Sequence, residues 1–167
     1  MTARIALLMG SDSDFPRLEP VLTTLRDFDI EPEVRVLSAH RTPAEACAFA
    51  EGARERGVEV LLCAAGGAAH LAGVISAHTS LPVIGIPLDN PPLGGLDALL
   101  ATVQMPGGVP VGTVGVGRGG PVNAALLALR ILGVADAGIS AKLDTFRTTQ
   151  HDRVLEKDSA LQEQVRA

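Results

Sequence analysis

The feature that most constrains this chain is an alternation, from Arg4 to Met105, of short apolar runs with longer amphipathic stretches. Such alternation is typical of a parallel sheet whose strands are joined by crossover helices. We therefore predict an α/β fold: a three-layer αβα sandwich with a flavodoxin-like, doubly wound parallel sheet and an extra C-terminal helix. The expected strands are Ile5–Met9, Glu33–Leu37, Val58–Ala64, Pro82–Ile86 and Val111–Val116. The expected helices are Phe15–Phe28, Pro43–Arg56, Ala68–His78, Gly95–Val103 and Val122–Leu132.

A length of 167 residues suits one domain. We expect a core over about residues 4–135 and a helical extension over about 136–167. The sequence contains no apolar run of the ~18 residues that a membrane span needs and begins without a signal-peptide pattern. We therefore expect a cytoplasmic protein with no membrane contact. The two cysteines, Cys47 and Cys63, stand apart and are expected to be small buried residues.

Aromatic side chains are scarce, with 4 Phe and neither Tyr nor Trp, and the net charge is −5. Nucleic-acid binding needs a basic surface or aromatic stacking, so this composition argues against it. Flavin binding is disfavoured for the same lack of aromatic side chains. We expect a small-molecule ligand.

Ligands of such sheets bind at the carboxyl ends of the strands. The first strand runs into Gly-Ser-Asp-Ser-Asp at residues 10–14. Hydroxyls and free backbone N–H groups at a helix start favour an anion such as phosphate, or they simply cap the helix. Since a carboxylate would repel phosphate, Asp14 suits the hydroxyl groups of a sugar better.

The second strand ends in Ser-Ala-His-Arg-Thr-Pro at residues 38–43. Arg41 offers a planar fork for phosphate, and His40 can exchange protons near neutral pH. The third strand ends in Ala-Ala-Gly-Gly-Ala-Ala-His at residues 64–70. Its small side chains would let a flat ligand lie against backbone, unless they only permit tight strand–helix packing. His70 is either a ligand contact or a residue of the following turn.

Other kinds of site fit poorly. Residues 115–120 match G-x-G-x-x-G, but no second strand ending in an acid follows, so we reject dinucleotide binding and expect a flexible turn. The histidines show no metal-ligand spacing, and no G-x-S-x-G nucleophile elbow is present. We expect no metal and no cofactor.

The three strand ends, in this order and spacing, closely resemble the N5-carboxyaminoimidazole ribonucleotide mutase family of purine biosynthesis. The likeness covers about residues 4–150 and continues through Pro-Val-Ile-Gly-Ile-Pro at 82–87, Val-Gln-Met-Pro at 103–106, Pro-Val-Gly-Thr at 110–113 and Asn-Ala-Ala-Leu-Leu-Ala at 123–128. The resemblance implies CO2 transfer from the exocyclic nitrogen N5 to ring carbon C4 of the substrate. It also implies a homo-octamer that needs no metal, nucleotide cofactor or ATP.

The resemblance also assigns roles to residues. It makes His40 the general acid and base and places Asp14 on the ribose hydroxyls. It assigns the ribose phosphate to four residues: Ser11, Ser13, Ser38 and Arg41. The imidazole and the migrating carboxylate would be bordered by His70 and by the backbone of Gly66, Gly67 and Ala68.

This chain departs from the family's usual pattern at Ala72, where Pro is usual, and in the Pro/Gly-rich segments Asp89–Gly95 and Gly107–Gly108. We expect none of these departures to touch a residue with an assigned role.

Two alternative functions stay open. A direct carboxylase of the same fold would use free CO2, but its motifs resemble Ser-Ala-His-Lys and Gly-Arg-Ser-Asn, so Arg41 and the run 67–70 favour the mutase. A non-catalytic phosphonucleotide-binding module would leave His40 unexplained.

Overall fold

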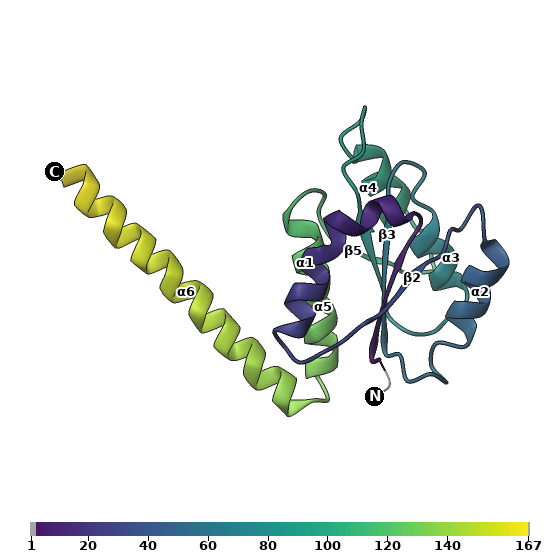
Figure 1. Cartoon of the computed structure of the whole chain (residues 1–167), viewed down its shortest axis with the longest axis horizontal. Coiled ribbons are helices and arrows are strands. Elements are labelled where there is room, and N and C mark those ends of the chain that lie inside the picture. Colours follow the sequence, from purple (N-terminus) through teal and green to yellow (C-terminus); the bar gives the residue numbers. More distant parts are fainter. Residues whose placement is uncertain (1–2, 167) are drawn as a thin grey trace. The chain divides into compact units, whose positions relative to one another are not determined.

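Five parallel strands form the sheet of this protein in a computed structural model that describes residues 3–166 (Figure 1). The strand order is β2-β1-β3-β4-β5. The strands are β1 (Ile5–Met9), β2 (Glu33–Val36), β3 (Val60–Ala65), β4 (Val83–Pro87) and β5 (Gly112–Thr113). With helices on both faces, this confirms the predicted three-layer, flavodoxin-like α/β fold.

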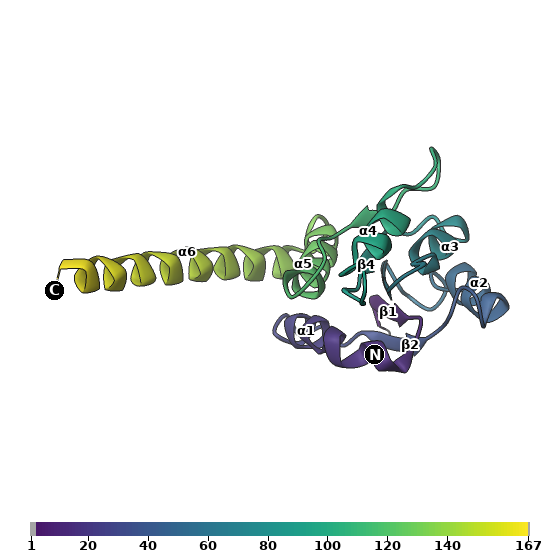
Figure 2. The same ribbon diagram turned by 90° about the horizontal axis from the view of Figure 1, so that it is seen from above.

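The helices are α1 (Phe15–Arg26), α2 (Pro43–Glu51), α3 (Leu71–Ala77), α4 (Leu96–Val103), α5 (Gly119–Gly133) and α6 (Ala137–Arg166), with a short 3₁₀ turn at Asp12–Asp14. Helices α2, α3 and α4 cover one face of the sheet, and α1 and the first part of α5 cover the other (Figure 2). The chain divides into two compact units between Ala128 and Leu129. The assignment of the chain to a single domain stays a prediction.

The centre of the sheet is apolar on both faces. All five residues of β1 are buried, as are the five of β4. Strand β1 lies between β2 and β3, with Ala6 opposite Glu33 on one side and Ile5 opposite Val60 on the other. Burial on both faces is what a parallel sheet between two helical layers requires, and it explains why these strands are continuous apolar runs.

Helix α2 is shorter than predicted, ending at Glu51 and not at Arg56. The chain turns at Gly52, and the Arg56 side chain folds back: its Nη2 donates to the Phe49 carbonyl at 3.0 Å, and its guanidinium carbon lies 4.2 Å from the centre of the Phe49 ring. Arg56 therefore satisfies a carbonyl at the end of the helix instead of extending it.

Strand β5 is also shorter than predicted, because only Gly112 and Thr113 pair with β4. One more backbone bond follows, from Val114 N–H to Gly85 O at 3.2 Å. The chain then turns at Gly117, whose φ of +86° lies in the left-handed region that favours glycine. Helix α3 likewise starts three residues late, after the turn that Gly67 begins with a φ of +62°.

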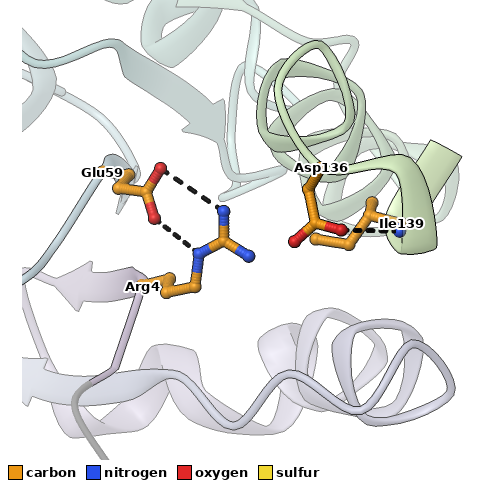
Figure 3. Close-up of polar contacts among 4 residues, drawn as sticks. All are labelled: Arg4, Glu59, Asp136 and Ile139. Carbon is orange, nitrogen blue, oxygen red and sulfur yellow. Dashed lines mark hydrogen bonds and ion pairs between the residues drawn. The ribbon is translucent and has the colours of Figure 1, made fainter.

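An ion pair joins the residues that precede the neighbouring strands β1 and β3, at the amino-terminal end of the sheet. Arg4 precedes β1, and its guanidinium meets both carboxylate oxygens of Glu59, the residue before β3 (Figure 3). The longer of the two contacts, from Nη2 to Oε2, is 3.4 Å. A bidentate pair at this position fixes the alignment of β1 against β3 at the end remote from the ligand-binding edge.

The second unit contains the long helix α6. Asp136 caps its start: the carboxylate Oδ1 accepts from the backbone N–H groups of Gly138 at 3.0 Å and Ile139 at 3.1 Å. Figure 3 shows the bond to Ile139. Beyond Ile139 the helix becomes strongly polar, and its side chains are exposed from Gln150 to Arg166. Across residues 3–166, no helix combines the length and apolarity needed to cross a membrane.

Candidate active site

A cavity of about 390 Å³ opens at the carboxyl ends of β1, β2, β3 and β4. Its walls bring together nine of the ten residues predicted to form the site: Ser11, Ser13, Asp14, Ser38, His40, Arg41, Gly66, Ala68 and His70. Gly67 does not line the cavity. Three further lining residues, Gly10, Ala39 and Ala65, belong to the predicted strand-end motifs but had no assigned role, and Leu71 follows the third motif directly. Sequence reasoning missed Asn90.

The loop after β1 is held by its own hydroxyls. The Oγ atoms of Ser11 and Ser13 lie 2.8 Å apart, and Ser11 Oγ also accepts from the Ser13 backbone N–H at 3.4 Å. Asp12 Oδ1 accepts from the same N–H at 3.0 Å. Two hydroxyls are thereby fixed side by side at the cavity wall, an arrangement able to donate to the oxygens of an anion.

The loop after β2 is organised around Ser38. Its Oγ accepts from the backbone N–H groups of His40 at 3.3 Å and Arg41 at 3.2 Å. Thr42 closes the loop, since its Oγ1 accepts from Ser38 N–H at 2.8 Å and donates to Ser38 O at 3.2 Å. The Arg41 guanidinium donates to the carbonyl of Gly10. This contact ties the β2 loop to the β1 loop and brings the positive charge beside the paired serines.

His40 and His70, thirty residues apart, meet in the cavity. Nε2 of His40 lies 2.8 Å from Nδ1 of His70, and the two rings are nearly perpendicular, at 83° with their centres 4.9 Å apart. In such a contact one nitrogen donates and the other accepts, so a single proton lies between the rings. The pair can therefore hold or release one proton at a defined point of the cavity.

Asp14 stands at the start of α1, on the β1 side of the cavity. Partial burial raises the pKa of its carboxyl, and the positive charges of Arg17 and Arg41 offset only part of that effect. The carboxylate accepts a hydrogen bond from the backbone N–H of Ser11, and it lines the cavity, where hydroxyl groups of a ligand can also reach it.

The loop after β3 contributes backbone instead of side chains. Gly67 adopts its positive φ with open space around it, and the turn continues with bonds from Ala69 N–H to Gly67 O at 2.8 Å and His70 N–H to Ala68 O at 2.9 Å. Gly66 is needed for a different reason. A Cβ on Gly66 would lie 2.0 Å from the side-chain nitrogen of Asn90.

The contact between Gly66 and Asn90 overturns one expectation. We expected the segment Asp89–Gly95 to leave every residue with an assigned role untouched, yet Asn90 lies directly against Gly66 and lines the cavity. The signal was available in the sequence: Asn90 follows the fourth strand, whose carboxyl end lies at the same edge as the other three.

A second, mainly apolar pocket of about 340 Å³ adjoins the same edge, with Arg17, Asp89, Arg118 and several prolines in its walls. The G-x-G-x-x-G match at 115–120 forms a turn into α5, and β5 is the last strand of the described chain.

Among residues 3–166, no cluster of three His, Cys, Asp or Glu side chains could hold a metal ion. Cys63 is buried, as predicted, and burial raises the pKa of its thiol; Cys47 is only partly buried.

The sequence of the chain is similar to a known protein family over most of its length. The family model described as AIR carboxylase matches residues 4–153. The N5-carboxyaminoimidazole ribonucleotide mutase of Mycobacterium tuberculosis (strain CDC 1551 / Oshkosh) is 51% identical over 159 residues, covering 95% of this chain and 90% of the relative. The enzyme of the same name from Bacillus subtilis (strain 168) is 45% identical over 161 residues, covering 96% and 99%.

Two solved structures with lower sequence identity superpose on almost the whole chain. The crystal structure of Treponema denticola PurE2-S38D superposes with a TM-score of 0.85 at 27% identity, covering 96% of this chain and 99% of that one. Treponema denticola PurE gives a TM-score of 0.80 at 26% identity, with coverage of 94% and 97%.

Proposed function

The chain belongs to the AIR carboxylase family, and from that premise we propose that it is an N5-carboxyaminoimidazole ribonucleotide mutase. It would convert N5-carboxyaminoimidazole ribonucleotide to 4-carboxy-5-aminoimidazole ribonucleotide in purine biosynthesis, an isomerisation. The observation that carries the proposal is the identity of 45–51% to relatives of that name over almost the whole chain. The cavity supports it, because an anion-binding wall and a proton-exchanging histidine pair face the same space.

We assign the nucleotide phosphate to the wall formed by the first two loops. Ser11 and Ser13 offer neighbouring hydroxyls, and Ser38 and Arg41 line the same cavity, with the Arg41 guanidinium bonded to Gly10 beside them. The forked guanidinium suits a phosphate, and its bond to Gly10 O holds it in place before the ligand arrives. Asp14 then accepts from the ribose hydroxyls.

Proton transfer falls to His40. Protonation of N5 by His40 breaks the N5–carboxylate bond and releases CO2, leaving an electron-rich aminoimidazole. Carbon C4 attacks that CO2, a C–C bond forms, and His40 takes the proton that C4 loses. One imidazole serves both steps, because the proton given to N5 is replaced by the one from C4.

The histidine pair prepares this exchange. Nε2 of His40 lies 2.8 Å from Nδ1 of His70, and in this contact one of the two nitrogens is the donor and the other the acceptor. A substrate nitrogen that enters between the rings would take the place of the His70 nitrogen. Holding the proton donor and the departing CO2 in one cavity supplies the proximity that the second bond-forming step requires.

The backbone wall suits the intermediate. Gly66 and Ala68 line the cavity with minimal side chains, with Gly67 between them in the loop, so a flat imidazole can lie close to the peptide groups. A neutral, linear CO2 needs confinement more than polar contacts. Exclusion of water by the substrate that fills the cavity would then favour recapture over escape.

We also propose, from the family resemblance, that the chain assembles as a homo-octamer in the cytoplasm and acts on its small-molecule substrate without nucleic acid, metal or cofactor. Light scattering coupled to size-exclusion chromatography tests the assembly directly. A species of eight chains is expected, and a monomer at micromolar concentration would contradict it.

The activity is tested by incubating the purified protein with N5-carboxyaminoimidazole ribonucleotide in the absence of ATP and measuring 4-carboxy-5-aminoimidazole ribonucleotide. Turnover of this substrate is expected. Turnover only of 5-aminoimidazole ribonucleotide with bicarbonate would instead identify a direct carboxylase. Binding of both nucleotides without turnover of either would indicate a non-catalytic binding module.

A further inference from the structure

Asn90 is held in the lining of the cavity by the backbone that follows β4. Leu88 N–H donates to Ala65 O at 3.0 Å, which extends the pairing of β4 with β3, and Asn90 N–H donates to Leu88 O at 3.0 Å. Pro91 follows, and a residue before proline is restricted to extended backbone. The side chain of Asn90 is thus carried on a defined backbone at the carboxyl edge of the sheet.

Arg17 fixes which way the Asn90 amide faces. The Arg17 guanidinium donates from Nη1 to Oδ1 of Asn90, and Arg17 also lies 3.7 Å from the Asp89 carboxylate. A guanidinium has only donors, so the amide oxygen must face Arg17 and the amide nitrogen must face away from it. That nitrogen lies over Gly66, where a Cβ would come within 2.0 Å of it. The amide N–H groups of Asn90 are therefore directed to the backbone wall of the cavity.

The position of β4 indicates which part of a ligand lies there. The phosphate wall belongs to the loops after β2 and β1, and β3 and β4 follow in that order across the sheet. Asn90 thus follows a strand that β1 and β3 separate from β2, whose loop carries Ser38 and Arg41. Residues 65–69 carry no side-chain donor, so the Asn90 amide supplies a donor where the loop after β3 has none.

We propose that Asn90 is a substrate-binding residue whose amide nitrogen donates to the carboxylate of the carboxylated nucleotide, with Arg17 as its positioning residue. This inference rests on the proposed function. The carboxylate is the acceptor that distinguishes the carboxylated nucleotides from 5-aminoimidazole ribonucleotide. The positive charge of Arg17 behind the amide oxygen polarises the amide and strengthens its donation to an anion.

The test compares the affinities of two nucleotides, 4-carboxy-5-aminoimidazole ribonucleotide and 5-aminoimidazole ribonucleotide, by isothermal titration calorimetry. In Asn90→Ala, which removes the donor, we expect the carboxylated nucleotide to bind about tenfold more weakly and the uncarboxylated one to bind as before. Asn90→Asp puts a negative charge in its place and should weaken the carboxylated nucleotide further. Equal losses for both nucleotides, or no loss for either, would overturn the assignment.

Arg17 is tested through the ratio of the two affinities, because it also lies near Asp14 and its removal can weaken both nucleotides together. Arg17→Met should lower the ratio of the affinity for the carboxylated nucleotide to the affinity for the uncarboxylated one. In a protein that already carries Asn90→Ala, Arg17→Met should lower this ratio no further. Arg17→Lys, which keeps a donor, should restore part of the ratio. The matched control is Arg118→Met, since Arg118 lines the same neighbouring pocket as Arg17. An unchanged ratio in Arg17→Met would refute the positioning role.

The outcomes separate this inference from the proposed function. An unaltered protein that binds neither nucleotide contradicts the proposed function itself. An unaltered protein that binds and turns over the carboxylated nucleotide, while Asn90→Ala keeps the same affinity ratio, contradicts the role of Asn90 alone. Circular dichroism and thermal melting of each variant show whether a loss of binding reflects unfolding.

Discussion

The loops after β1 and β2 approach a ligand with side chains, whereas the loop after β3 approaches it with backbone. On the first side, Ser11 bonds Ser13, and Arg41 bonds Gly10. On the second side, the loop from Ala65 to Ala69 has no side chain larger than a methyl group. The two halves nevertheless face one cavity of about 390 Å³.

The difference shows two ways of preparing a site before the ligand arrives. Side chains that already bond one another lose little freedom on binding, so the hydroxyls and the guanidinium are pre-organised for an anion. Backbone needs no such ordering, because strand pairing holds β3 as far as Ala65 and backbone hydrogen bonds within the turn hold the loop beyond it. The first half is suited to a charged group and the second to close approach by a flat one.

The strongest test of the comparison is His40→Asn, because His40 is the only proposed proton-transfer group of the side-chain half. We expect kcat to fall by about 10²–10⁴-fold, the usual contribution of general acid–base catalysis, while nucleotide affinity is kept. Steady-state kinetics and calorimetry measure the two quantities. Near-normal turnover would show that the proton is carried elsewhere.

Arg41→Ala should have the next largest effect, and on binding. Loss of a charged partner for the phosphate should raise KM by about 10–100-fold, the value of a hydrogen bond to a charged group. The Gly10 carbonyl also loses a donor, but it lies at an exposed wall. An unchanged KM would remove Arg41 from the phosphate site and with it the electrostatic part of the side-chain half.

Gly67→Ala probes the backbone half through conformation alone. A methyl group at this position meets open space, but a φ of +62° is unfavourable for alanine. We expect the free energy of unfolding to fall by about 1–2 kcal/mol, measured by denaturant titration. Gly67→Asn should cost less, since asparagine tolerates this region. Equal stability of Gly67→Ala and the unaltered protein would mean that the loop relaxes to another conformation.

Asp14→Asn should give the smallest effect, and its sign depends on pH. Burial raises the pKa of the native carboxyl above 3.8, so ionisation is less favourable in the folded than in the unfolded protein. Stability of the unaltered protein is therefore lost as the pH rises from 3.8 through the native pKa. The variant should gain stability relative to it at pH 7 and lose that gain below pH 3.8. A gain that grows on acidification would contradict this pKa direction.

Much of the fold could be predicted because the strands are buried on both faces. Their apolar runs stand out from the amphipathic helices, and β1 has the predicted bounds. The errors lie where contacts outside the local pattern end an element: Arg56 returns to the Phe49 carbonyl where α2 stops, and only Gly112 and Thr113 of the predicted fifth strand pair with β4. Neither contact can be inferred from local periodicity.

The site could be predicted where its residues lie within one loop. Ser38, His40 and Arg41 share a single motif, and the structure places all of them in the cavity. The contacts that join loops were not predictable from spacing, including the approach of His40 to His70 and of Asn90 to Gly66. Asn90 follows the fourth strand in a Pro/Gly-rich segment, where no hydroxyl, histidine or arginine indicates a ligand site.

The placement of β1 has a consequence for how the protein is made. β1 is the first strand of the chain, yet it pairs with β3 through Ile5 and Val60. During synthesis both edges of β1 can therefore be paired only after the third strand has left the ribosome. The ligand site that contains the serines after β1 stays incomplete for the same time. A nascent chain thus carries an uncovered apolar strand next to an unfinished ligand site, and chaperone binding at this stage would delay both folding and substrate capture.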